Sequence, residues 1–171
     1  TAKEMQRSEA AKISIIGNIS IDSGEFGSDI HWEIDGNNHL YISGTGTMPG
    51  FTSVAEIPWS KYADTVEYIE IEDGVTSVTT KAFYNFKALK NVKISKTVEH
   101  IEASAFLGCT FIEEMELPFV GISKNAAGKD GLLGIIFGGA TSENGILQCF
   151  SREGNSLSGN YYAIPKTLKK I

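Results

Sequence analysis

The sequence predicts a β-dominated α/β solenoid: a right-handed superhelix with a ladder of parallel strands, preceded by a β-hairpin. A 23-residue period runs through the centre of the chain, and apolar residues within each period alternate as in a half-buried strand. A second alternating segment, interrupted by a turn, lies upstream of that period. Of the 171 residues, 42% are hydrophobic and 18 are glycine, which indicates an ordered, turn-rich chain.

The repeat consists of two successive segments, VEYIEIEDGVTSVTTKAFYNFKA from Val66 and LKNVKISKTVEHIEASAFLGCTF from Leu89. A third copy begins with IEEMELP at Ile112. Each complete copy contains an alternating strand segment and, further on, an Ala-Phe pair. One such unit cannot bury its apolar side alone, so we expect the copies to stack with their strands parallel and paired at a shift of 23 residues.

Stacking at this shift places the polar residues of the strands in rows on an exposed, concave face. Glu70, Lys93 and Glu116 form one row, in which opposite charges face each other on neighbouring strands. The candidate binding residues on this face are Tyr68, Glu70, Glu72, Asn91, Lys93, Glu114 and Glu116. Such a face could dock the basic patch of a partner, or it could simply keep an exposed sheet soluble.

The repeated segments, and above all the Ala-Phe pairs and Gly108-Cys109, resemble the BspA-like, or Treponema-type, leucine-rich repeats of bacterial surface proteins. A strand in every copy of ~20–29 residues is typical of leucine-rich repeats. The resemblance implies a non-catalytic, secreted or cell-surface module that binds an extracellular protein or a glycan in adhesion. A structural spacer or cap of a larger surface protein is the alternative. The ligand, the oligomeric state and the choice between the concave face and the 138–160 hairpin as the binding surface stay open.

The flanking segments extend the resemblance. Upstream, HWEIDGNNHLYISGTGTMPGF predicts a hairpin about the turn 35–38, and Pro58 begins a short helix that carries Trp59 and Tyr62. Downstream, 164–171 aligns with 94–101 at a shift of 70, while Ile146 to Phe150 and Asn160 to Ile164 predict a second hairpin. The expected organisation is an N-terminal arm (1–12), a hairpin capping module (13–65), and repeats ending in an elongated, irregular copy (66–171).

Charge and hydropathy exclude two classes of partner. Residues 1–65 contain four basic and nine acidic side chains, and residues 66–118 contain five and nine, so these two thirds should repel nucleic-acid phosphates unless the excess of six basic over three acidic side chains in 119–171 forms a patch. The longest apolar-leaning run, 132–140, contains three glycines and is far shorter than the ~20 residues of a membrane span. We therefore expect neither nucleic acid binding nor membrane insertion.

No arrangement of residues indicates catalysis, a cofactor or a metal. The three histidines lack metal-ligand spacing. The segment from Asp22 to Glu33 has acids at the ends of an EF-hand loop but Gly24 and Phe26 at two ligand positions, so it is interpreted as an ordinary turn. Cys109 and Cys149 lack metal or disulfide spacing and are expected to be buried thiols. We therefore expect that the chain is not an enzyme.

Overall fold

The computed structural model describes residues 19–139, 145–150 and 160–171, so the predicted arm of residues 1–12 lies outside the described residues. The strands are β1 (Ser20–Phe26), β2 (Ile30–Asp35), β3 (His39–Gly44), β4 (Gly46–Thr47), β5 (Tyr68–Ile71), β6 (Val75–Val78), β7 (Asn91–Ile94), β8 (His100–Ile101), β9 (Glu114–Glu116), β10 (Gly145–Phe150) and β11 (Asn160–Pro165). The 3-10 helices are η1 (Val54–Glu56), η2 (Ser60–Tyr62), η3 (Gly128–Gly131) and η4 (Leu133–Phe137).

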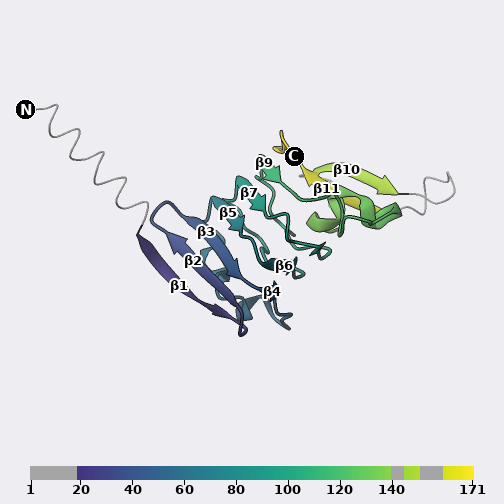
Figure 1. Cartoon of the computed structure of the whole chain (residues 1–171). Coiled ribbons are helices and arrows are strands. Elements are labelled where there is room, and N and C mark those ends of the chain that lie inside the picture. The colour runs from purple at the N-terminus through teal and green to yellow at the C-terminus, as the bar shows by residue number, and fades with distance from the viewer. Residues whose placement is uncertain (1–18, 140–144, 151–159) are drawn as a thin grey trace, which may run out of the picture.

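A six-stranded sheet in the order β1-β2-β3-β5-β7-β9 runs through the molecule (Figure 1). From β3 onward neighbouring strands are parallel, and Ile69 pairs with Val92 and Val92 with Met115. Each of these pairs is separated by 23 residues, so the predicted register is confirmed. Alternate side chains of the strands point into the core, and the others lie on the opposite, exposed face.

The predicted upstream hairpin is present as β2 and β3, with Trp32 opposite Ile42 and Ile34 opposite Leu40. The Asp35 carboxylate accepts hydrogen bonds from the backbone N–H groups of Asn37 and His39, which stabilises the turn. Strand β3 also pairs in parallel with β5. The parallel ladder therefore includes a strand that precedes the first 23-residue copy.

Two strand pairings depart from the sequence analysis. The segment 22–33 is not merely a turn, because β1 pairs antiparallel with β2 along the edge of the sheet. Phe26 is the one residue of β1 that is buried, so this strand lacks the apolar alternation by which a half-buried strand is recognised. A second, three-stranded sheet of β4, β6 and β8 was also not predicted, in which β6 and β8 belong to the two complete copies and β4 precedes the first of them.

The predicted α component is wrong for the described residues 19–139, 145–150 and 160–171, where every helix is a short 3-10 helix. The turn after Pro58 is one of these, η2, which begins after Trp59. A 23-residue copy that already contains two strands leaves only short connections, and these close as turns rather than as α-helices.

A column of aromatic rings fills the core between the repeats. Trp59 stacks on Phe83 at a centroid distance of 6.2 Å, and Phe83 stacks on Phe106 at 5.0 Å. Phe137 of η4 continues the column at 6.3 Å from Phe106. All four side chains are buried, so the Ala-Phe pairs recognised in the sequence do supply the stacked core between successive copies.

The second predicted hairpin is confirmed as β10 and β11, in which Ile146 pairs with Ile164. The alignment of 164–171 at a shift of 70 is wrong. Lys170 instead lies beside Glu114 as the next parallel partner of the ladder, and the Met115 N–H donates to the Lys170 carbonyl at 3.0 Å. A run of widely spaced apolar residues fits two registers equally well, and backbone pairing with β9 selects this one.

The two cysteines differ in environment. Cys109 is buried and its thiol donates a hydrogen bond to the Phe83 carbonyl, with Sγ 2.9 Å from the oxygen. Burial raises the pKa of this thiol to about 12, so it stays protonated at neutral pH. Cys149 is exposed, so the expectation of two buried thiols is wrong for this residue, which lies on a two-stranded hairpin outside the main sheet.

Candidate binding face

The exposed face of the six-stranded sheet brings together the residues that the sequence nominated. Six of them alternate with buried residues along three strands: Tyr68 and Glu70 on β5, Asn91 and Lys93 on β7, and Glu114 and Glu116 on β9. The seventh, Glu72, follows β5 directly. The cross-strand pairs Glu70–Lys93 and Lys93–Glu116 reproduce the predicted row. We call this surface the strand face.

Lysines neutralise much of the acidic charge at the repeat end of the strand face. Lys93 Nζ lies 2.7 Å from Glu70 Oε1, and Lys170 Nζ lies 3.4 Å from Glu114 Oε2. Next to the face, ion pairs of 2.7 Å join Lys90 to Glu67 and Lys169 to Glu113. Of the four glutamates among the nominated residues, Glu70 and Glu114 are therefore paired within the chain, whereas Glu72 and Glu116 make no ion pair with the described residues.

The ion pair at Glu70 shifts the pKa values of its members. Burial acts to raise the pKa of the Glu70 carboxyl, but hydrogen bonds from Lys93 and from the Tyr68 hydroxyl, at 2.9 Å, hold it below its ordinary value. The hydrogen bond to Glu70 raises the pKa of Lys93. Burial, followed by the hydrogen bond to Glu70, raises the pKa of Tyr68, so this phenol stays neutral and acts as a donor.

A double-mutant cycle with Glu70→Gln and Lys93→Met should give a coupling energy of no more than about 1 kcal/mol, because the Lys93 side chain is 46% exposed and water screens the pair. The coupling energy should also fall as the pH decreases, because the pKa of Glu70 is lower in the folded chain than in the unfolded chain. The stabilisation is then fully present above the unfolded-state pKa and is lost as the pH falls through the folded-state pKa. Urea denaturation of the four proteins at neutral and acidic pH measures both effects. A coupling that grows on acidification would contradict this account.

An aromatic cluster at the other end of the strand face was not predicted. His39 and Tyr41 of β3 join Tyr68 of β5, with ring centroids 4.9 Å apart for His39–Tyr68 and 6.4 Å apart for Tyr41–Tyr68. His39 pairs with Tyr68 and Tyr41 pairs with Glu70 in the parallel register of β3 and β5. The sequence assigned β3 to a separate module, so it contained no signal that these side chains extend the rows of the repeats.

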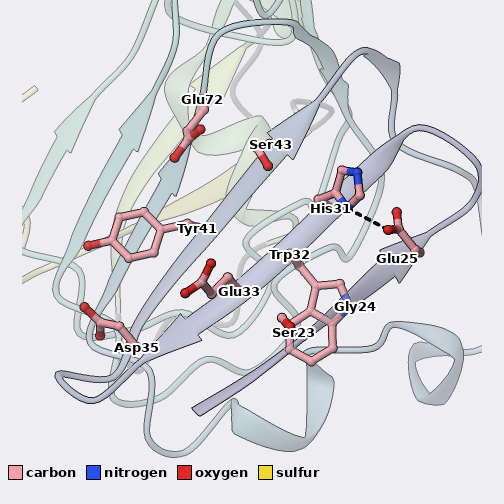
Figure 2. Close-up of a pocket in the computed structure, with 10 residues that line it drawn as sticks. All are labelled: Ser23, Gly24, Glu25, His31, Trp32, Glu33, Asp35, Tyr41, Ser43 and Glu72. Carbon is pink, nitrogen blue, oxygen red and sulfur yellow. Dashed lines mark ion pairs between the residues drawn. The ribbon is translucent and has the colours of Figure 1, made fainter. Parts of the chain in front are cut away.

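Beside this cluster lies an open hollow of about 620 Å³, formed over β1, β2, β3 and the end of β5. Figure 2 shows its lining residues. They are Ser23, Gly24, Glu25, His31, Trp32, Glu33, Asp35, Tyr41, Ser43 and Glu72. The lining contains four carboxylates and no lysine or arginine, which makes it the most acidic part of the strand face.

The four carboxylates of the hollow differ in their partners. Glu25 pairs with His31 at 2.7 Å, and Asp35 accepts the backbone hydrogen bonds of its own turn. The carboxylates of Glu33 and Glu72 are exposed and make no hydrogen bond or ion pair with the part of the chain that the structure describes. Within the hollow, the uncompensated negative charge therefore lies at Glu33 and Glu72, on either side of β3.

Other kinds of site are not found in the described ranges. Within residues 19–139, 145–150 and 160–171, no three His, Cys, Asp or Glu side chains are arranged to hold a metal ion. The helices of these same ranges are all too short to cross a bilayer. His31 lies opposite Ser43 across the hairpin and not opposite His39, so the two imidazoles do not form a pair.

Comparison with known proteins supports the repeat assignment. Residues 53–128 match the family model of the BspA type leucine rich repeat region, in six copies. A leucine-rich repeat protein from Eubacterium ventriosum is similar in structure, with 29% identity, a TM-score of 0.54, and coverage of 58% of this chain and 26% of that chain. A leucine rich cell surface protein from Faecalibacterium prausnitzii aligns with 23% identity, a TM-score of 0.32, and coverage of 58% of this chain and 31% of that chain. No curated protein matches the chain.

The stacked copies, their parallel ladder and the matching solved structure define a leucine-rich-repeat protein. The repeats over residues 53–128 are of the BspA type, so the resemblance seen in the sequence is confirmed there. The aligned part of this chain covers less than a third of the length of both solved proteins.

Proposed function

We propose that this chain is a non-catalytic recognition module of a secreted or cell-surface bacterial protein, and that it binds an extracellular protein or a glycan through the strand face. The observation that supports the proposal is the continuous exposed face of six paired strands, which combines rows of charged residues, an aromatic cluster and an acidic hollow. With neighbouring strands ~4.8 Å apart, the face is roughly 24 Å wide, enough for an extended segment of a partner. The proposed location at the cell surface is supported by the BspA type of the repeats.

Charge reversal on the strand face tests this proposal. The double variant Glu70→Lys, Glu116→Lys should weaken binding to immobilised extracellular-matrix proteins or arrayed glycans by about tenfold or more, because it inverts the central row of the face. A matched control, Asp64→Lys with Glu99→Lys, makes the same change in net charge outside the six-stranded sheet and should retain binding. Equal binding by wild type and both variants would contradict the proposal.

A rigid spacer within a larger surface protein is the second candidate. The unbroken ladder from β1 to β9 and the aromatic column favour it, because both couple each unit to its neighbours. A spacer would bind none of the arrayed proteins or glycans, and charge reversal on the strand face would leave these binding measurements unchanged. The same binding measurements therefore separate the two functions.

A further inference from the structure

In two places in the structure, a carboxylate binds a lysine ammonium of the same chain and also accepts a hydrogen bond from a tyrosine hydroxyl. On the strand face, Glu70 accepts from Lys93 Nζ at 2.7 Å and from the Tyr68 hydroxyl at 2.9 Å. Each carboxylate oxygen thus receives one donor. The phenol orients the carboxylate while the ammonium supplies the opposite charge.

The second example ties the edge strand β1 to η2. Asp22 Oδ2 lies 2.7 Å from Lys61 Nζ and accepts the Tyr62 hydroxyl at 2.6 Å. The Lys61 ammonium also lies 5.1 Å from the centroid of the Tyr62 ring, within the range of a cation–π contact. A lysine, a carboxylate and a tyrosine therefore recur together in two unrelated parts of the fold.

The hollow contains carboxylates and a tyrosine but no lysine, and the Tyr41 hydroxyl lies 3.3 Å from His39 Nδ1 rather than donating to a carboxylate. Glu33 pairs with Tyr41 across β2 and β3, and Glu72 lies on the far side of Tyr41 along the hollow (Figure 2). Burial raises the pKa of Tyr41, and the charges of Asp35, Glu70, Glu33 and Glu72 add to this effect. The phenol is therefore neutral and surrounded by carboxylates, two of which the described residues leave unpaired.

We propose that this hollow binds a lysine side chain presented by an extended segment of another protein, with Glu33 and Glu72 contacting the ammonium and Tyr41 contacting the lysine beside it. The inference rests on the proposed function and narrows it to a protein partner with a basic segment. Charge complementarity supports this occupant over a neutral glycan, because a neutral sugar gains nothing from two uncompensated carboxylates. The volume of about 620 Å³ accommodates a lysine side chain together with part of the backbone that carries it.

Synthetic peptides provide the test. A fluorescein-labelled nonapeptide with lysine at every second position, diluted into the purified chain, should increase in anisotropy on binding. The same peptide with acetyl-lysine has the same length and no side-chain charge, and it should bind at least about tenfold more weakly. The variant Glu33→Gln, Glu72→Gln should weaken binding of the lysine peptide by about tenfold, and Tyr41→Ala should weaken it less.

The control variant Asp64→Asn, Glu99→Gln removes the same charge from exposed positions outside the six-stranded sheet and should bind the lysine peptide within about twofold of wild type. Equal losses in the control would show attraction to net charge alone and would overturn the site. Equal binding of the lysine and acetyl-lysine peptides would overturn it as well. Circular dichroism verifies that each variant is folded.

The same measurements separate failure of this inference from failure of the proposed function. If binding to matrix proteins or glycans is lost in Glu70→Lys, Glu116→Lys but unchanged in Glu33→Gln, Glu72→Gln, the strand face binds a partner and the lysine site is wrong. A neutral oligosaccharide whose binding depends on Glu33 and Glu72 would likewise overturn the choice of a basic segment while leaving a recognition module. Absence of binding to every peptide, protein and glycan overturns both.

Discussion

Replacing Phe83 or Phe106 with alanine is expected to lower the free energy of unfolding by about 3–5 kcal/mol. Both rings are fully buried, and they stack on each other at a centroid distance of 5.0 Å. Removal of either ring opens a cavity between two copies of the repeat, where the short strands and turns leave little room for collapse. Urea denaturation with unchanged m-values measures the loss.

Phe111 provides the matched control for this prediction. It is also a phenylalanine of the repeats, but its side chain is 55% exposed. Phe111→Ala should therefore lower the free energy of unfolding by less than about 1 kcal/mol. Losses that small at both Phe83 and Phe106 would contradict the stacking of the copies.

Replacing Trp59 with alanine should destabilise the chain by about 3–5 kcal/mol, because this residue joins the hairpin module to the first repeat. Its ring is fully buried between Phe26, at 5.2 Å, and Phe83, at 6.2 Å. Its Nε1–H donates to the Ala82 carbonyl at 2.9 Å, across 23 residues of sequence. If the hairpin module and the repeats unfold together, thermal and urea unfolding of the variant should still show a single transition, shifted to lower temperature and lower urea concentration.

A pair of phenylalanine substitutions isolates the hydrogen bond of Trp59. Trp59→Phe leaves the Ala82 carbonyl without its donor, which costs about 1–3 kcal/mol in addition to the lost volume. Trp32→Phe removes a similar volume, but Trp32 Nε1 is buried and makes no hydrogen bond with the described residues, so no partner among them is orphaned. Trp59→Phe should therefore be the more destabilising of the two. Equal effects would mean that the hydrogen bond contributes nothing.

The sequence predicted those elements that depend on local periodicity. The coincidence of Ile69, Val92 and Met115 at a shift of 23 predicted the parallel register, because a slip of one residue would turn every apolar side chain to solvent. The alternation about the turn 35–38 predicted the upstream hairpin in the same way. The seven nominated residues consequently do lie on or directly beside one face.

Features that depend on pairing between unlike segments were decided only in the tertiary structure. Strand β1 and the second sheet carry little apolar alternation, and Lys170 joins the ladder through backbone hydrogen bonds that no side-chain pattern encodes. The pairing of β3 with β5 moved the centre of the candidate site. It placed Tyr41 and Glu33 in the rows of the repeats, whereas Lys93 neutralises the Glu70 that the sequence had favoured.

The sequence by itself thus determined the repeat, its register and the face that stays exposed, since each follows from which residues must leave water. The tertiary structure alone decided which charges on that face are compensated. Whether a carboxylate is neutralised depends on the reach of a lysine from a neighbouring strand and on the geometry between them, and these are properties of the packed molecule. That distinction separates Glu70, which is paired with Lys93, from Glu33 and Glu72, whose side chains have no partner among the described residues and on which the proposed recognition of a basic segment depends.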